Sequence, residues 1–225
     1  MKEKQSIKIH VYKTLREAIL SRKLPPGKQI VENVISNKLN ISRTPIRSAI
    51  NQLAMEGLVE IVPNKGAFVI NPTLDEILQA YQLRKELEIM AVELSLNHLK
   101  ESNLKAMEKM VEKEKEALYK KDMENYLKAN QHFHMQLTSQ CGNKFLIEFI
   151  DKLINQTSIY LILFDVFFEE QSPQPYGYKE HLEIINLIRQ KDRKKLKNAL
   201  AKHFDNAIKS LNIKSDYSDL DKIFE

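Results

Sequence analysis

The sequence predicts a mainly α-helical protein, with an N-terminal winged helix-turn-helix followed by an all-helical bundle. Three observations predict this division. Apolar residues recur at helical spacing along most of the chain, a short β-type alternation interrupts this spacing near residues 58–70, and basic residues are concentrated before residue 72. We therefore expect one domain over residues 1–72, a second over residues 73–213 and a C-terminal tail over residues 214–225.

Length and composition are those of a folded globular protein, with 225 residues of which 43% are hydrophobic and 29% charged. The opening MKEKQSIK lacks the apolar segment of a signal peptide, and the chain contains no run of 18 apolar residues. A single cysteine, Cys141, cannot form an internal disulfide and fits a reducing compartment. We expect a cytoplasmic protein with no membrane partner.

Charge is distributed unevenly between the two parts of the chain. Residues 1–72 contain 12 Lys or Arg and five Glu, a net charge of +7, whereas the remainder has a net charge of −2. A positive field at the N-terminus attracts a polyanion such as DNA.

The first 57 residues contain a predicted helix-turn-helix. One amphipathic helix ends at the PPG of residues 25–27, and a second short helix ends at Asn40, a residue type that tolerates positive φ. Ser42 is a good N-cap and Pro45 suits the first turn of a third helix. The buried stripe of that helix is expected at Ile46, Ala49, Ile50 and Leu53. Two helices joined by about three residues are typical of this motif.

The hydrophobic period changes from 3.6 to 2 after Gly57. The runs LVEIV and AFVI are rich in β-branched and aromatic residues, and PNKG separates them, which predicts a hairpin. This hairpin is the wing. From Thr73 onward the spacing is helical again, and we expect helices at 73–99, 101–120, 122–140, 143–168, 176–190 and 193–211.

The candidate DNA contacts lie at the start of the third helix and at the tip of the wing. A recognition helix brings its N-terminal residues closest to the bases, and an arginine there can bond guanine in a bidentate fork or hold a phosphate. The predicted contacts are Ser42, Arg43, Thr44, Arg47, Lys65 and Gly66. The alternative is that the arginines only solvate an exposed helix face while Ser42 caps it.

Histidines in the second part suggest a metal site. Asn130 and His134 are four residues apart on one helix face, and His181 and His203 are placed symmetrically about a predicted turn at Asp192. In an antiparallel helix pair this symmetry puts the two histidines at the same height. Such a set suits Zn, Ni, Co or Mn, with Zn the first candidate. The alternative is that each histidine is an ordinary half-buried residue with a hydrogen-bonded ring.

The N-terminal residues resemble the DNA-binding domain of GntR-type bacterial transcription regulators. The similarity lies in the PPG, the Glu-bearing second helix, S-R-T-P-[VI]-R, G-L-[VI] and the G-[AT]-x-V wing. The matching residues here are Pro26-Gly27, Glu32, Ser42–Arg47, Gly57–Val59 and Gly66–Val69. The resemblance implies operator contacts by Arg43, Thr44 and Arg47, and a wing contact by Gly66.

The second part resembles the all-helical FCD effector domain of the FadR-like branch of that family. The similarity is carried by Asn130–His134, Glu180-His181, His203 and the GN of residues 142–143. It implies a metal site at Asn130, His134, His181 and His203. LRKELE at residues 83–88 matches the R-x-x-x-E helix of the family, which implies that Arg84 reaches an anionic effector. An i,i+4 pair between Arg84 and Glu88 is the alternative interpretation.

We therefore expect a homodimeric transcription regulator, most simply a repressor, that binds a pseudo-palindromic DNA operator and responds to a small organic acid bound near the metal. Two alternatives stay open. A three-histidine centre can also serve a metal-dependent hydrolase, and the helical part can act only in dimerisation, without an effector. No Ser-His-Asp order, phosphate-binding glycine loop or CxxC pattern supports catalysis.

Overall fold

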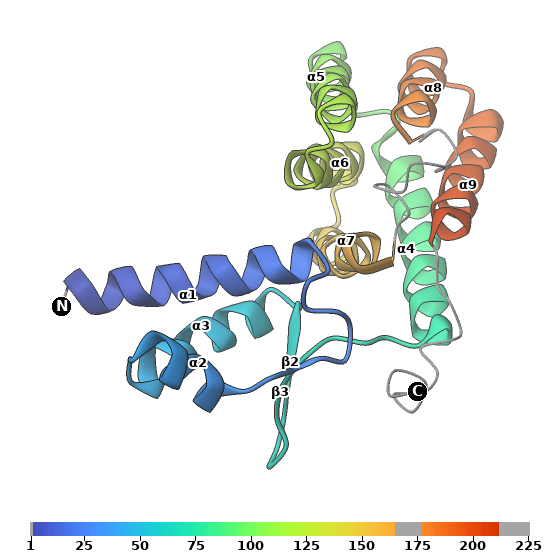
Figure 1. Cartoon of the computed structure of the whole chain (residues 1–225). Helices are drawn as coiled ribbons and strands as arrows, with labels where there is room; N and C mark the ends of the chain where they lie inside the picture. Colours follow the sequence, from blue (N-terminus) through green and yellow to red (C-terminus); the bar gives the residue numbers. More distant parts are fainter. Residues whose placement is uncertain (1, 165–176, 212–225) are drawn as a thin grey trace. The chain divides into compact units, whose positions relative to one another are not determined.

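The computed structural model describes residues 2–164 and 177–211, and side chains from residue 7 onward. The chain divides into two compact units, Met1–Thr73 and Leu74–Glu225. Each unit has its own hydrophobic core, and Figure 1 labels the helices of both units and the strands β2 and β3. Among the helices within the described ranges, none combines the length and the apolar character that a membrane span requires.

The first unit is a helix-turn-helix with a small sheet. Its elements are α1 (Lys2–Leu20), β1 (Gln29–Ile30), α2 (Glu32–Leu39), α3 (Arg43–Met55), β2 (Val59–Val62) and β3 (Gly66–Val69). The strands form an antiparallel sheet in the order β1-β3-β2, in which Val62 pairs with Gly66 beside the turn. The predicted wing is therefore the β2–β3 hairpin. Strand β1 was not predicted from the sequence.

A tight turn joins α2 to α3. Asn40 adopts the left-handed conformation with φ 52°, and its amide donates to Ser36 O. The Ser36 hydroxyl donates to Ile41 O at 2.7 Å and holds the next residue of the turn. The expectation that Asn40 takes positive φ is confirmed, because an asparagine side chain tolerates this region better than most.

Helix α3 is anchored by its apolar stripe, and α2 is not anchored in the same way. Helix α3 packs against α1 and β2, and its buried residues are the four predicted ones, Ile46, Ala49, Ile50 and Leu53. No residue of α2 is buried within the described structure, and Val34 is 62% exposed. Helix α2 is therefore held by its turn and by polar contacts to α3 more than by apolar burial.

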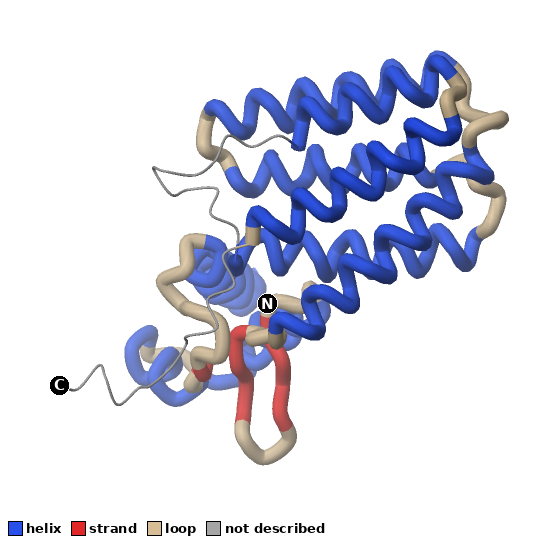
Figure 2. The backbone as a smooth tube through the Cα atoms, turned by 90° about the vertical axis from the view of Figure 1, so that its right-hand side faces the viewer, coloured by secondary structure: helices blue, strands red, loops and turns tan. Residues whose placement is uncertain are grey.

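The second unit is a bundle of α4 (Leu74–Ser95), α5 (Glu101–Tyr119), α6 (Met123–Thr138), α7 (Lys144–Phe164), α8 (Gly177–Gln190) and α9 (Arg193–Ser210). Neighbouring contacts run from α4 to α7, α6, α5, α8, α9 and back to α4, so the helices form a closed ring. Figure 2 shows them lying alongside one another. Residues 165–168 and 176, which were expected to be helical, lie outside the described residues.

Helix ends follow local capping chemistry. Helix α4 ends at Ser95 instead of residue 99, because the amides of His98 and Leu99 turn back to Ser95 O. Asp122 and Asp192 accept hydrogen bonds from backbone amides of the first turns of α6 and α9. These caps fix where the helices that carry His134 and His203 begin.

Truncating the α3 stripe should unfold the first unit, whereas truncating an exposed neighbour should not. Leu53 is fully buried and Met55 is 82% exposed on the same helix. We expect Leu53→Ala to lower the free energy of unfolding by about 2–5 kcal/mol, and Met55→Ala to change it by less than about 0.5 kcal/mol. Urea denaturation followed by circular dichroism measures both. Equal effects of the two substitutions would contradict the assigned burial.

Candidate nucleic-acid interface and buried histidine site

The start of α3 presents polar side chains to solvent. The buried stripe holds the opposite face of the helix against the first unit's core, so Arg43, Thr44 and Arg47 are exposed. Ser42 is exposed as well and precedes the helix in extended conformation. The four residues predicted at this helix start therefore lie on one accessible surface.

Ser42 occupies the N-cap position without capping the helix. Its side chain makes no capping hydrogen bond to any residue that the structure describes. The expectation that Ser42 caps α3 is therefore wrong for its hydroxyl, although the backbone starts the helix at the expected place. An uncapped helix start keeps its hydroxyl and first amides available to an anionic oxygen, such as that of a phosphate.

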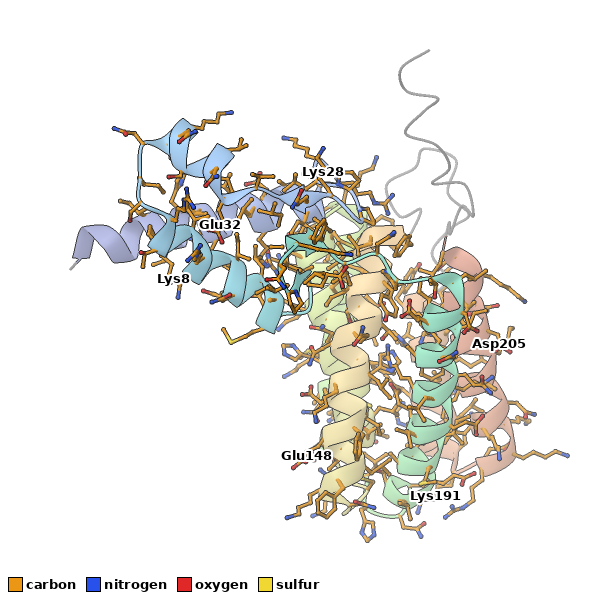
Figure 3. All side chains as sticks on the ribbon, turned by 90° about the horizontal axis from the view of Figure 1, so that it is seen from below. Lys8, Lys28, Glu32, Glu148, Lys191 and Asp205 are labelled. Atoms are coloured by element: carbon orange, nitrogen blue, oxygen red, sulfur yellow. The ribbon has the colours of Figure 1, made fainter. Side chains whose placement is uncertain are left out.

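Arg47 forms an ion pair that the sequence did not predict. Its Nε donates to both carboxylate oxygens of Glu32, at 2.8 and 3.1 Å, and so links α3 to the first residue of α2. Glu32 is labelled in Figure 3. Glu32 and Arg47 are 15 residues apart in the sequence. Helical spacing predicts contacts between residues three or four apart, so it does not predict this pair.

The wing tip is a three-residue turn whose end is tied to β1. Asn64 has φ 61° and Gly66 has φ 104°, and both Lys65 and Gly66 are exposed. Gln29 donates from Nε2 to Lys65 O at 2.8 Å, and the same atom would lie 3.4 Å from a Cβ added at Gly66. Gln29 therefore supports the turn that carries both predicted wing contacts.

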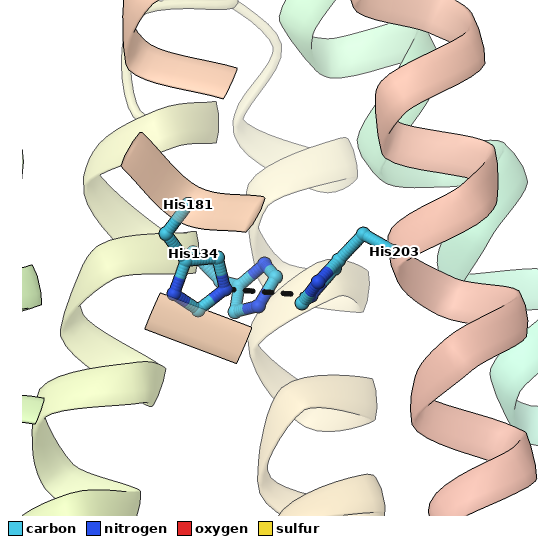
Figure 4. A group of neighbouring side chains, drawn as sticks. All are labelled: His134, His181 and His203. Atoms are coloured by element: carbon cyan, nitrogen blue, oxygen red, sulfur yellow. Dashed lines mark hydrogen bonds between the residues drawn. The ribbon is translucent and has the colours of Figure 1, made fainter. Parts of the chain in front are cut away.

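Three histidines converge inside the second unit. His134 comes from α6, His181 from α8 and His203 from α9, and one ring nitrogen of each lies within 4.8 Å of the other two. Nε2 of His181 and Nε2 of His203 are 3.4 Å apart (Figure 4). All three side chains are buried, with residue exposures of 1%, 0% and 6%. The equal heights expected from the turn at Asp192 agree with this contact.

A carboxylate holds the other ring nitrogen of each histidine. Nδ1 of His134 lies 2.7 Å from Glu88 Oε2, Nδ1 of His181 lies 2.7 Å from Glu114 Oε2, and Nδ1 of His203 lies 2.8 Å from Glu180 Oε2. A carboxylate can only accept, so Nδ1 carries the proton and Nε2 presents its lone pair. Glu114 and Glu180 were missed by sequence reasoning, although Glu180 directly precedes His181.

Burial keeps the imidazoles in the form that binds metals. It is the largest cause that lowers the pKa of His134 well below the usual histidine range, and the nearby charge of Arg84 adds to the effect. Burial also lowers the pKa of His203, although its hydrogen bond to Glu180 opposes that shift. Neutral imidazoles at neutral pH follow from both shifts.

The carboxylates respond in different ways to the same interior. Burial raises the pKa of Glu88, and the charge and hydrogen bond of Arg84 oppose that rise. For Glu180, hydrogen bonds from His203 and from Asn206, at 2.6 Å, outweigh burial and lower the pKa of its carboxyl group. The arrangement of an acceptor behind each imidazole is the one that orients metal-bound histidines in proteins.

Asn130 lies on α6, one helical turn before His134, and is 6% exposed. Residues four apart share a helix face, so the backbone allows both side chains to face the same region. The three histidines form the cluster whose donor atoms meet, and participation of Asn130 in it remains a prediction.

Arg84 lies beside the cluster and bonds in two directions. Its Nε donates to Glu88 Oε1 at 2.6 Å and its Nη1 donates to Thr157 Oγ1 on α7 at 2.7 Å. The alternative expectation, an i,i+4 pair with Glu88, is therefore present. Nη2 is buried and has no hydrogen-bond partner among the residues that the structure describes. The guanidinium carbon lies 5.3 Å from the centre of the Phe204 ring.

Comparison with known proteins identifies both parts of the chain. Residues 8–69 match the model of bacterial regulatory proteins of the gntR family, and residues 79–206 match the model of the FCD domain. The HTH-type transcriptional repressor RspR of Escherichia coli (strain K12) is 23% identical over 216 residues, which are 96% of this chain and 93% of RspR. The uncharacterized HTH-type transcriptional regulator YdhC of Bacillus subtilis (strain 168) is 27% identical over 202 residues, 88% of this chain and 87% of YdhC.

Solved structures show the same fold. A crystal structure of a transcriptional regulator GntR from Rhodococcus sp. RHA1 is 23% identical with a TM-score of 0.66, and covers 91% of this chain and 96% of that one. The FCD model alone spans more than half of the sequence, and the GntR model spans the winged helix. The chain therefore belongs to the GntR family, and is a DNA-binding transcription regulator with an FCD domain rather than an enzyme.

Proposed function

We propose that this regulator is a homodimer whose affinity for a pseudo-palindromic operator changes when a small carboxylate binds beside a divalent metal ion in the helical unit. The observation that carries the proposal is the convergence of three Nε2 lone pairs, each fixed by a carboxylate on the opposite ring nitrogen. RspR, which is similar to this chain, is named a transcriptional repressor, and this supports repression as the direction of control.

Operator recognition is assigned to the start of α3 and to the wing. Arg43 and Arg47 are exposed on the same side of α3, and a guanidinium can bond guanine O6 and N7. Ser42, Thr44 and the helix start provide donors for phosphate oxygens, and Lys65 with Gly66 provides the wing contact. A dimer with two-fold symmetry presents these surfaces to two half-sites.

The donor set fits a divalent cation. Nε2 of His181 and Nε2 of His203 are both acceptors when Nδ1 carries the proton, so the 3.4 Å contact between them gains no hydrogen bond from two neutral rings. Glu88, Glu114 and Glu180 each place a carboxyl group behind one of the histidines. Neutral nitrogen ligands suit Zn first and Ni, Co or Mn as alternatives.

His134, His181 and His203 would hold the ion, and Asn130 is assigned as a fourth ligand. The ion would supply positive charge that attracts an anionic oxygen. Nη2 of Arg84 is buried and has no hydrogen-bond partner among the described residues, and such a group favours a ligand that accepts a hydrogen bond. A small carboxylate fits both requirements.

Glu88 connects the two halves of this site. Its Oε1 accepts from Arg84 and its Oε2 accepts from His134, so one carboxylate contacts both the proposed effector residue and a proposed metal ligand. Arg84 also bonds to α7 through Thr157. A bound effector whose carboxylate draws Arg84 toward the ion would act on α4, α6 and α7 together. This offers a route to a population shift between two dimer arrangements.

Loss of one recognition arginine should abolish operator binding. We expect Arg47→Ala and Arg43→Ala each to weaken binding at least about tenfold, because a bidentate contact to guanine contributes about 1–3 kcal/mol. The probe is a DNA duplex selected from a random library by the wild-type protein, and the measurement is an electrophoretic mobility shift. Lys13→Ala, a change of an exposed residue on α1, is the control. If Arg47→Ala bound the selected duplex with wild-type affinity, the assignment of α3 as the recognition helix would be wrong.

Removing one histidine should remove the metal. Untagged protein should contain about one equivalent of divalent metal by elemental analysis, and chelation should lower its melting temperature. We expect His134→Ala and His203→Ala to lose most of that metal. His132→Ala is a matched control, because His132 is exposed on the same helix as His134. A metal-free wild-type protein, or full metal content in His134→Ala, would contradict the site.

Arg84 should be required for carboxylate binding. We expect acetate, lactate, succinate or benzoate to bind the metal-loaded protein in calorimetric titrations, and Arg84→Gln to weaken that binding at least about tenfold, because it removes a charged donor. Arg189→Gln removes an exposed arginine that pairs with Glu101 and Glu108, and should leave binding unchanged. Equal affinities in Arg84→Gln and the wild type would show that the effector does not contact Arg84.

A further inference from the structure

Glu32, the first residue of α2, and Arg47, the fifth residue of α3, form an ion pair. Glu32 begins α2, where a negative charge is favoured by the helix dipole, and its side chain is 28% exposed. Arg47 lies across the turn on α3 with its side chain 63% exposed. The Glu32 side chain is therefore the less exposed partner of the pair.

The ion pair occupies only one edge of the guanidinium. Both hydrogen bonds to Glu32 come from Nε of Arg47, at 2.8 and 3.1 Å. Nη1 and Nη2 make no hydrogen bond to any residue that the structure describes. A bidentate bond to guanine requires two N–H groups on one edge, and Nη1 with Nη2 supplies that fork. The pair leaves the base-reading edge free while it fixes the direction of the side chain.

The Glu32 carboxylate also disfavours non-specific DNA binding. The first unit carries a net charge of +7 over residues 1–72, and such a field binds any DNA backbone. An arginine that is already paired with a carboxylate gains less from a phosphate, and turning toward a phosphate would break its bonds to Glu32. Specificity is a difference between two binding free energies, so it increases when binding to the wrong DNA is weakened as well as when binding to the right DNA is strengthened.

We propose that Glu32 is a specificity-determining residue, which holds Arg47 in position to read a base and disfavours its use on phosphates. The proposal rests on the assignment of Arg47 as an operator contact. Glu32 acts through Arg47, and is therefore a positioning residue with an additional electrostatic effect. Its removal should weaken operator binding and strengthen binding to unrelated DNA at the same time.

The test compares two duplexes and three variants of the full chain. One duplex is selected from a random library by the wild-type protein, and the other is a scrambled duplex of the same length and composition. Glu32→Ala removes the charge and the hydrogen bonds, whereas Glu32→Gln keeps an oxygen that can accept from Nε. Glu17→Gln is the matched control, since it removes one exposed carboxylate of the same unit on α1. Thermal melting verifies that each variant is folded.

For Glu32→Ala we expect affinity for the selected duplex to fall about three- to fivefold, the range of an exposed ion pair, and affinity for the scrambled duplex to rise about threefold. The logarithmic salt dependence on the scrambled duplex should steepen by about one unit, because Arg47 then binds a phosphate. Glu32→Gln should show the same gain on scrambled DNA with a smaller loss on selected DNA. Glu17→Gln should leave the ratio of the two affinities unchanged.

A double variant separates this proposal from the assignment on which it rests. In an Arg47→Ala background, Glu32→Ala should change neither the ratio nor the salt dependence. If Arg47→Ala lowers the ratio but Glu32→Ala leaves it unchanged, Glu32 does not determine specificity, although Arg47 still reads DNA. If Glu17→Gln lowers the ratio as much as Glu32→Ala does, net charge explains the effect and the proposal is wrong. If Arg47→Ala keeps the wild-type ratio of affinities for selected and scrambled DNA, Arg47 does not read the operator and Glu32 does not determine specificity.

Discussion

Three hydrogen bonds between carboxylates and imidazoles, two of them fully buried and one partly buried, link helices in the interior of the helical unit. Glu88 joins α4 to α6, Glu114 joins α5 to α8, and Glu180 joins α8 to α9. Arg84 adds α7 through Thr157. Charged groups inside a protein are costly unless they are paired, so these bonds constrain how the helices can rotate against one another. The closed ring of helices and the convergence of the histidines depend on the same contacts.

The histidine cluster is buried, and its ring nitrogens already have carboxylate partners. A catalytic metal centre keeps an open position that water or substrate reaches, and it needs a base near that position. Here the three histidines are at most 6% exposed, and their carboxylate partners are already committed to orienting them. The chain also belongs to a family of transcription regulators.

In both units a carboxylate holds a basic side chain by hydrogen bonds. In the helical unit, Glu88 faces Arg84 with one oxygen and His134 with the other. In the winged helix, Glu32 holds Arg47 while the outer edge of the guanidinium stays exposed. The two differ in solvent access, because the first pair is fully buried and the second lies at the surface. Removing one partner of the buried pair would leave an unpaired buried charge, whereas the surface pair is screened by solvent.

The sequence by itself determined the features that depend on local spacing. Apolar periodicity located the α3 stripe and the bundle helices, the left-handed turn was expected at Asn40, and symmetry about Asp192 placed His181 opposite His203. Only the tertiary structure decided which side chains meet across helices. The carboxylate behind each histidine, the Glu32 partner of Arg47 and the β1 strand depend on helix rotation and chain reversal. One-dimensional spacing does not encode these rotations, because packing of all neighbouring faces sets them together.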